Sequence, residues 1–286
     1  MVDRPAPPSG ARNFVLLVLD SCRFDSFVAA KPRIMGALGT IERRYSYATW
    51  TAPAHFNLLM GLLPHAGQGG TLASRVYAQT FREHRHRLGV PEMSFSRMLP
   101  SLWLPTTLRE GLGYATGALV SLPVLNPETP LSRDFDVYVQ GERHDDLDGL
   151  TEQLRFDGGR PWFWLINTGE THYPYAAAGR AHTALPHLHG LHGVFRRLAA
   201  GEPLRAEDTP DLFRPETLAA LRARQVQAVR DVDAAVGRLL ARCPPGTWVT
   251  ITSDHGECFG EGGYFGHGPI PHEKVLEVPF VEGMVR

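Results

Sequence analysis

Three long apolar runs constrain the fold of this chain more than any other feature of its sequence. They occupy residues 13–19 and 161–167, which are continuous runs, and residues 248–252, which form an apolar and β-branched run. Strands of this kind are buried on both faces, as in parallel sheets. Helix-type segments separate them, above all the amphipathic stretch 216–242. The sequence therefore predicts a three-layer α/β fold, in which helices cover both faces of a mostly parallel central sheet.

Weaker local signals place the remaining elements. A glycine predicts that a helix over 106–113 ends there, and the apolar run over 114–121 follows as a strand. A polar helix is expected over 145–156. Residues 278–281 are expected to close the sheet as an edge strand, because their proline has no N–H to donate to a ladder. Residues 65–104 show no clear pattern.

Length favours one domain over residues 1–286. A chain of this size can bury a substantial core in a single α/β domain, and the sequence contains no repeat or clear linker. We expect the proline-rich residues 1–12 to form a flexible lead. Residues 176–212 are expected to form an active-site loop.

Charge and composition argue against several classes of protein. A formal net charge of −1 gives no electrostatic reason to bind nucleic acid or an anionic membrane. The N-terminus lacks the apolar core of a signal peptide, and no apolar run approaches the ~20 residues of a membrane helix. The three cysteines are irregularly spaced, which argues against a disulfide framework. We therefore expect a reduced, cytoplasmic setting.

Side chains that can bind a metal follow the predicted strands. Asp20 follows the first apolar run, and Asp254 and His255 follow the last. Ligands of α/β sheets lie beyond the carboxyl ends of the strands, where His172 could join this group. Carboxylate and imidazole ligands suit one divalent ion, such as Mn²⁺, Zn²⁺, Mg²⁺ or Ca²⁺. The alternatives are that Asp20 caps a helix and that the last loop is an ordinary surface loop.

Thr51 lies at the start of a predicted helix. Pro53 suits the first turn of such a helix, where a missing N–H is not needed. The Thr51 hydroxyl could cap the helix, or it could bind the cation and attack a phosphoryl group. Thr49 offers a competing hydroxyl. A glycine-rich loop after residue 255 could return His267 to the same place.

A basic cluster lies within residues 65–104. We expect it at the solvated surface, where it could also meet a charged part of a substrate. Its members are Arg82, His84, Arg85, His86 and Arg87.

Several motifs, in order along most of the chain, resemble those of the sulfatase and alkaline phosphatase superfamily. They are VLDSCRFD (18–25), TAPAH (51–55), GLLP (61–64), TLREGLGYATG (107–117), HYPY (172–175), SDHGE (253–257) and GHG (266–268). The chain most resembles short sulfatase-like hydrolases. The resemblance implies the same three-layer fold without the C-terminal subdomain of full-length sulfatases.

The resemblance also implies roles for individual residues. It makes Asp20, Asp254 and His255 metal ligands, and it places Thr51 where the superfamily keeps its metal-bound nucleophile. His55 falls where sulfatases keep an arginine that supports the nucleophile.

Two further histidines have two possible roles. His172 and His267 fall where the superfamily has substrate-oxyanion contacts or ligands of a second ion. Glu170 could complete such a second site with them.

Three departures from the superfamily pattern narrow the function. Sulfatases convert a cysteine or serine at position 51 to formylglycine, so Thr51 argues against sulfate-ester hydrolysis. Ser21 replaces the second aspartate of the sulfatase pair, as in phosphoethanolamine and glycerol-phosphate transferases. Thr168 stands where two-metal phosphodiesterases have an aspartate, which favours one ion.

These observations predict a metal-dependent phosphoester hydrolase or phosphoryl-type transferase, acting on a small phosphorylated molecule through a covalent intermediate on Thr51. A sulfatase or phosphonate ester hydrolase is the alternative within the same class of enzyme. A non-catalytic ligand-binding protein is the alternative from another class, and a phosphomutase is a further possibility. The sequence does not identify the oligomeric state.

Overall fold

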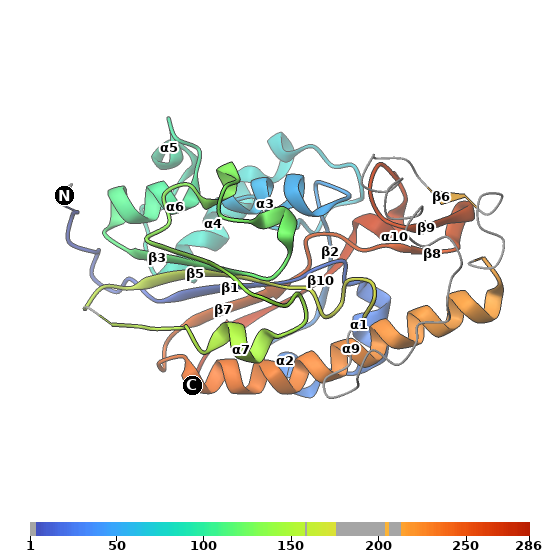
Figure 1. Cartoon of the computed structure of the whole chain (residues 1–286). Helices are drawn as coiled ribbons and strands as arrows, with labels where there is room; N and C mark the ends of the chain where they lie inside the picture. The colour runs from blue at the N-terminus through green and yellow to red at the C-terminus, as the bar shows by residue number, and fades with distance from the viewer. Residues whose placement is uncertain (1–3, 158, 176–203, 206–212) are drawn as a thin grey trace.

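The centre of the computed structural model, which describes residues 4–157, 159–175, 204–205 and 213–286, is a seven-stranded sheet (Figure 1). Its strand order is β2-β10-β7-β1-β5-β3-β4. The strands are β1 (Phe14–Leu19), β2 (Glu42–Tyr45), β3 (Ala115–Val120), β4 (Val137–Gln140), β5 (Trp162–Thr168), β7 (Trp248–Thr252) and β10 (Glu277–Met284). β10 runs antiparallel to both neighbours, and the other pairs are parallel. The predicted mostly parallel sheet is therefore confirmed.

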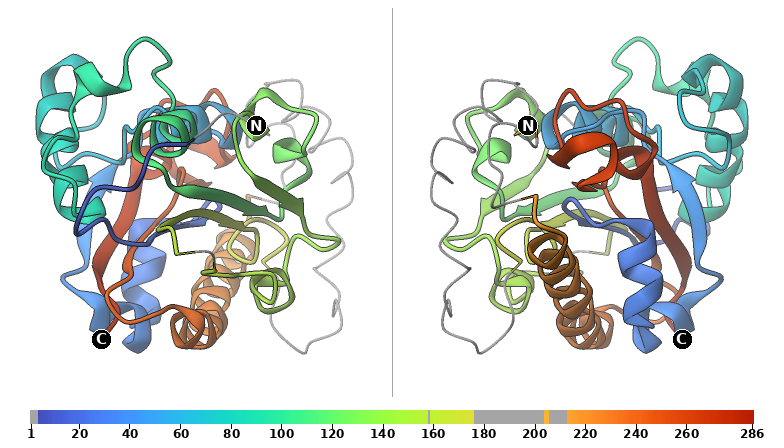
Figure 2. Two further views of the ribbon diagram at one scale, coloured as in Figure 1. Left: turned by 90° about the vertical axis from the view of Figure 1, so that its left-hand side faces the viewer. Right: turned by 90° about the vertical axis from the view of Figure 1, so that its right-hand side faces the viewer.

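Helices cover both faces of this sheet, which confirms the three layers (Figures 1 and 2). One face carries α1 (Phe24–Ala30), α2 (Arg33–Leu38), α7 (Leu147–Thr151) and α9 (Pro215–Arg242). The other carries α3 (Thr51–Leu59), α4 (Ala73–Leu88), α5 (Phe95–Met98) and α6 (Leu104–Thr106). A second sheet of β6 (Leu204–Arg205), β9 (Tyr264–Gly266) and β8 (Cys258–Phe259) precedes α10 (Glu273–Leu276).

The side chains of β1 explain why the sheet needs both helical layers. Phe14 and Leu16 pack into the core that contains residues of α3 and α4, whereas Val15 and Leu17 pack into the core that contains residues of α1 and α9. All four are fully buried. Successive side chains of a strand point to opposite faces, so an unbroken apolar run requires cover on both sides.

The register of the central strands places their carboxyl ends side by side. Leu19 pairs with Thr168 of β5, and Val18 pairs with Thr252 of β7. The chain therefore leaves β1 and β7 at the same edge of the sheet, where Asp20 and Asp254 follow.

Three predicted elements differ from those observed. The helix expected over 145–156 is the five-residue α7, and the helix expected over 106–113 is α6 followed by a π-helical turn over Thr107–Gly111. The strand expected at an edge is β10, which lies between β2 and β7. Its Pro279 is tolerated because the β7 ladder begins only at Phe280, so no N–H is needed there.

The basic cluster is only partly on the surface, because α4 turns one side toward the core. His84 and Arg87 are fully buried, while Arg82 is exposed. The guanidinium of Arg87 lies 2.6 Å from a carboxylate oxygen of Glu282 on β10 and 2.8 Å from one of Glu83. The expectation of a wholly solvated cluster was wrong for these two residues.

Two further expectations concern the ends and loops of the chain. Apart from β6, the segment 176–212 that was expected to be an active-site loop lies outside the described residues. Within those described ranges, no helix combines the length and apolar character that crossing a membrane requires.

Candidate metal centre

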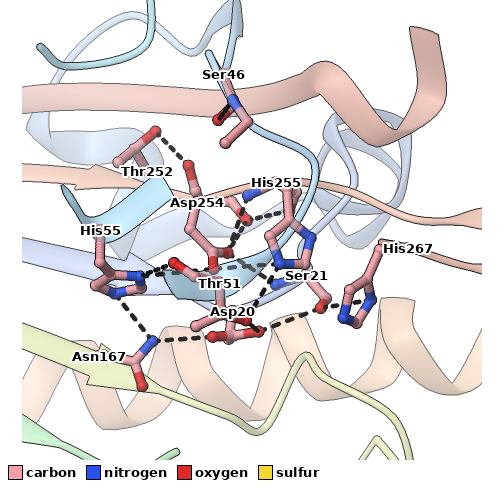
Figure 3. A network of polar contacts seen from close by, with 12 residues as sticks. Asp20, Ser21, Ser46, Thr51, His55, Asn167, Thr252, Asp254, His255 and His267 are labelled. Carbon is pink, nitrogen blue, oxygen red and sulfur yellow. Dashed lines mark hydrogen bonds and ion pairs between the residues drawn. The ribbon is translucent and has the colours of Figure 1, made fainter. Parts of the chain in front are cut away.

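Asp20, Asp254 and His255 come together where β1 and β7 end (Figure 3). Each offers one ligand atom, and the three atoms lie within 4.8 Å of one another. Among the described residues, this is the one group of three or more histidine, cysteine, aspartate or glutamate side chains that could hold a metal ion. All three side chains are buried. Their closeness confirms the prediction that the ends of β1 and β7 lie side by side.

The hydrogen bonds of Asp254 test whether a cation fits this group. Its Oδ1 accepts from the backbone N–H of Ser21 (3.1 Å) and of His255 (2.9 Å). Its Oδ2 is buried and has no hydrogen-bond partner among the described residues. A buried carboxylate oxygen without a partner is unfavourable, and a cation would satisfy it. The donor set therefore fits a divalent ion.

His255 presents an unprotonated nitrogen to the same place. Its Nδ1 lies 2.9 Å from the carbonyl oxygen of Gly256, which can only accept, so Nδ1 carries the proton. Nε2 then keeps its lone pair and lies 3.3 Å from Oδ2 of Asp254. A hydrogen bond that fixes the tautomer in this way is typical of metal-ligating histidines.

Thr51 is the first residue of α3, and its hydroxyl faces the group. Its Oγ1 lies 3.3 Å from Nε2 of His255 and 3.5 Å from Oδ1 of Asp20. The helix has Trp50 at its N-cap, and in the part of the chain that the structure describes no side chain caps it. The structure therefore does not support the alternative in which the Thr51 hydroxyl caps α3.

The pKa values of the group follow from its burial. Burial and the neighbouring Asp254 raise the pKa of Asp20 above its usual range. Burial raises the pKa of Asp254 to about 6 and lowers that of His255 to about 4. Two buried carboxylates that resist ionisation favour a bound positive charge, because a nearby cation stabilises the ionised form.

His55 lies one turn along α3 from Thr51 and uses both ring nitrogens within the protein. Its Nδ1 donates to the carbonyl oxygen of Thr51 at 2.8 Å. Its Nε2 lies 3.4 Å from Nδ2 of Asn167, whose other contact is Oδ2 of Asp20 at 3.1 Å. Burial lowers the pKa of His55, which keeps the ring neutral. His55 therefore links the first turn of α3 to Asn167 of β5.

His172 and His267 lie beside the group. The ring of His267 is 4.3 Å from that of His255 and 5.2 Å from that of His172, measured between centroids. Gly266 and Gly268, with φ of +82° and +114°, allow the sharp turn that returns His267. Burial, His255 and His172 lower the pKa of His267 well below its usual value.

Glu170, the third residue of the possible second ion site, is used elsewhere. Its carboxylate accepts from the hydroxyl of Thr168 and, at 2.7 Å, from the backbone N–H of Leu147 at the start of α7. Among the described residues, Glu170, His172 and His267 do not form a metal-type group.

Sequence reasoning assigned no role to two residues that support the centre. Asn167 was visible only as a polar residue at the end of an apolar strand. Gln225 lies on the buried side of α9, and its Nε2 is within 3.1 Å of the carbonyl oxygens of Ser21 and Thr171 and a carboxylate oxygen of Glu257. A single glutamine in an amphipathic helix pattern gives no signal of such contacts.

No protein-family model and no curated protein matches the chain. Several solved structures do. The C-terminal periplasmic domain of EcEptC from Escherichia coli, in complex with zinc, matches with a TM-score of 0.56 and 15% identity. A phosphonate monoester hydrolase of Agrobacterium radiobacter matches with a TM-score of 0.56 and 16% identity, and BT1596, a 2-O GAG sulfatase, with 0.56 and 12%.

These matches cover 98%, 95% and 96% of this chain but 74%, 68% and 64% of the respective matched chains. The integral membrane protein lipooligosaccharide phosphoethanolamine transferase A from Neisseria meningitidis matches at 14% identity and a TM-score of 0.53. That match covers 99% of this chain and 49% of the transferase, so this chain spans about half its length. At identities this low, the matches show a shared fold and nothing about activity.

Proposed function

We propose that this chain, which has the fold of the alkaline phosphatase and sulfatase superfamily, is a metal-dependent phosphoester hydrolase or phosphoryl-type transferase with Thr51 as its nucleophile. One observation carries the proposal. Oγ1 of Thr51 lies within 3.5 Å of both a carboxylate oxygen of Asp20 and Nε2 of His255. A hydroxyl beside two metal-type ligands is placed for activation by the ion that they bind.

A divalent cation held by Asp20, Asp254 and His255 would supply charge that lowers the pKa of the Thr51 hydroxyl and stabilises a transferring phosphoryl group. Oγ1 of Thr51 gives its proton to water and forms a bond to phosphorus as the bond from phosphorus to the leaving oxygen breaks, and the leaving oxygen takes up a proton from water. The product is a phosphorylated threonine. Water or a second alcohol then takes the phosphoryl group, which completes hydrolysis or transfer.

The donor set supports zinc or manganese as the ion. Asp20 and Asp254 offer hard oxygen ligands, and His255 offers an imidazole nitrogen, a ligand that suits zinc better than calcium or magnesium. We propose a single ion, because the described residues contain one group of this type.

The surroundings of Thr51 support a small phosphorylated substrate. The Thr51 side chain lies in a buried centre, and His172 and His267 lie beside the ligand His255. We propose that these two rings line the side of the site where the substrate binds. A net charge of −1 offers no attraction for the many phosphates of a nucleic acid.

A panel of four aryl esters tests the proposal: phosphate monoester, phosphate diester, phosphonate and sulfate. Each is offered to the zinc-loaded and manganese-loaded chain, and intact mass analysis and peptide mapping follow a rapid acid quench. We expect turnover of a phosphate ester and one phosphoryl group on the peptide that contains Thr51. Turnover of sulfate alone would support a sulfatase. Binding without turnover or adduct would support the non-catalytic alternative.

A further inference from the structure

Ser21, which directly follows Asp20, uses every hydrogen-bonding group that it has. Its N–H donates to Oδ1 of Asp254 at 3.1 Å, and its carbonyl oxygen accepts from Nε2 of Gln225 at 2.9 Å. Its Oγ lies 3.2 Å from Oδ1 of Asp20 and 3.4 Å from Nδ1 of His267 (Figure 3). One fully buried residue thus connects the ends of β1 and β7, the loop after β9 and helix α9.

The backbone of Ser21 is strained. Its φ of +59° lies in the left-handed region, which residues with a Cβ rarely adopt. Such a conformation persists only where the surroundings determine it, and it is concentrated at functional sites. At Ser21 the bonds to Asp254 and Gln225 hold the backbone in this conformation. The strained turn points the hydroxyl toward Asp20 and His267.

The chemistry of the partners fixes the direction of the two hydroxyl contacts. The Asp20 carboxylate, when ionised, can only accept, so the Ser21 hydroxyl donates to it. The same oxygen then accepts from Nδ1–H of His267, which leaves Nε2 of His267 unprotonated. The hydroxyl therefore orients one carboxylate of the metal-type group and selects the tautomer of the neighbouring histidine at once.

We propose that Ser21 is a positioning residue of the metal centre, in which a strained backbone orients Asp20 and Asp254 for a divalent cation and holds His267 in its Nδ1–H tautomer. This inference rests on the proposed function, because it concerns the same cation site. It goes further by assigning a role to a residue that is neither a predicted ligand nor the nucleophile.

Two variants separate the hydroxyl from the backbone strain. Ser21→Ala removes the hydroxyl and keeps the strain, whereas Ser21→Gly removes both. Ser26→Ala is the matched control, because Ser26 is an equally buried serine of α1 whose Oγ has no partner among the residues that the structure describes. Zinc affinity is measured by titration calorimetry on the metal-free full chain, and thermal unfolding is followed without metal.

Both Ser21 variants should bind zinc about tenfold more weakly or worse, as expected for lost support of metal ligands. Ser26→Ala should bind zinc like the wild type. Metal-free Ser21→Gly should melt about 2–4 °C above Ser21→Ala, because glycine adopts the left-handed backbone without strain. With saturating zinc, which favours an ionised Asp20, nitrogen-15 NMR should show Nδ1–H of His267 in the wild type and a redistributed proton in Ser21→Ala.

Wild-type zinc affinity in both Ser21 variants would overturn the inference, as would Ser21→Gly melting below Ser21→Ala or an unchanged His267 tautomer in Ser21→Ala. These measurements need no substrate, so the two proposals can fail separately. Weakened zinc binding in a chain that turns over no ester supports the inference and defeats the proposed function. A wild type that binds no zinc defeats both.

Discussion

Oγ1 of Thr51 lies 3.3 Å from Nε2 of His255, although 204 positions separate the two residues in the chain. The parallel register of β1 and β7 fixes one side of this contact, and the first turn of α3 fixes the other. A nucleophile at a helix N-terminus is also favoured when it carries negative charge, since free backbone N–H groups point toward it.

Removing the Thr51 hydroxyl should abolish turnover without unfolding the chain. We expect Thr51→Ala to lower kcat by at least about a thousandfold, because the nucleophile is lost. Its melting temperature should stay close to that of the wild type, since the hydroxyl caps no N–H of α3 among the described residues. Steady-state kinetics on the best ester and calorimetry measure the two effects.

Thr49→Ala is the matched control, because it removes the other threonine hydroxyl of the same segment. It should retain activity within a few-fold of the wild type, and Thr51→Ser should retain more activity than Thr51→Ala. If Thr51→Ala stays active while Thr49→Ala is dead, the nucleophile has been assigned to the wrong threonine.

Zinc should stabilise the chain more at pH 7.5 than at pH 5.0. Burial raises the pKa of Asp254 to about 6 from its usual value near 4. Between these two values the folded metal-free chain holds a proton that the unfolded chain has lost, so its stability falls as pH rises. Zinc must displace this proton at pH 5.0 but not at pH 7.5, which weakens apparent affinity at least about tenfold at the lower pH.

Titration calorimetry at the two pH values measures this change. His255 does not compete for protons in this range, because its pKa is lowered to about 4. Equal zinc affinity at pH 5.0 and pH 7.5 would contradict a role for Asp254 as a buried ligand.

His55 and His267 should affect different kinetic constants. Both ring nitrogens of His55 are used by Thr51 and Asn167, so His55→Ala should lower kcat about tenfold or more with little change in KM. His267→Ala removes a ring that lines the proposed substrate site and should raise KM. The milder His55→Asn keeps an N–H donor toward Thr51 and should recover part of kcat. A large rise in KM for His55→Ala would instead support direct substrate binding by His55.

The metal-type group could be predicted from the sequence because each of its members lies just beyond the end of a strand. Asp20 follows an unbroken apolar run, Asp254 comes soon after an apolar and β-branched one, and a parallel sheet brings such ends together. Ser21 and Asn167 could not be assigned in the same way, since their contacts depend on a left-handed backbone and on a carboxylate 147 positions away. Sequence patterns carry no information on either.

The edge position expected for residues 278–281 was wrong for a related reason. A proline is excluded from a strand only where the ladder needs a backbone N–H. Whether it does depends on where the ladder with the neighbouring strand ends. The β7 ladder stops at the pairing of Phe280 with Thr252, one residue beyond Pro279. The end of the ladder depends on the lengths of both strands, and the sequence of β10 alone does not give the length of β7.

The buried ion pair of Arg87 also escaped prediction, because its partner Glu282 is 195 positions away. We expect Arg87→Leu to lower the free energy of unfolding by about 3–5 kcal/mol, since it leaves the carboxylate of Glu282 without its guanidinium partner, while Glu83 keeps Arg44. Arg82→Leu, on the exposed side of α4, should change it by less than about 0.5 kcal/mol. Chemical denaturation of both variants measures the difference.

The double variant Arg87→Leu/Glu282→Gln should regain part of the lost stability, because it removes the uncompensated charge. Equal effects of Arg87→Leu and Arg82→Leu would show that the two arginines are equally solvated, as the sequence alone suggested.

The proposed chemistry depends most on a cation that binds Asp20, Asp254 and His255 next to the Thr51 hydroxyl. A crystal structure of the zinc-soaked chain, with anomalous data at the zinc edge, tests this directly. We predict one strong anomalous peak about 2.0–2.2 Å from ligand atoms of these three side chains, with Oγ1 of Thr51 in contact with it. Zinc bound elsewhere, or a peak at these side chains with the Thr51 hydroxyl turned away, would contradict the account.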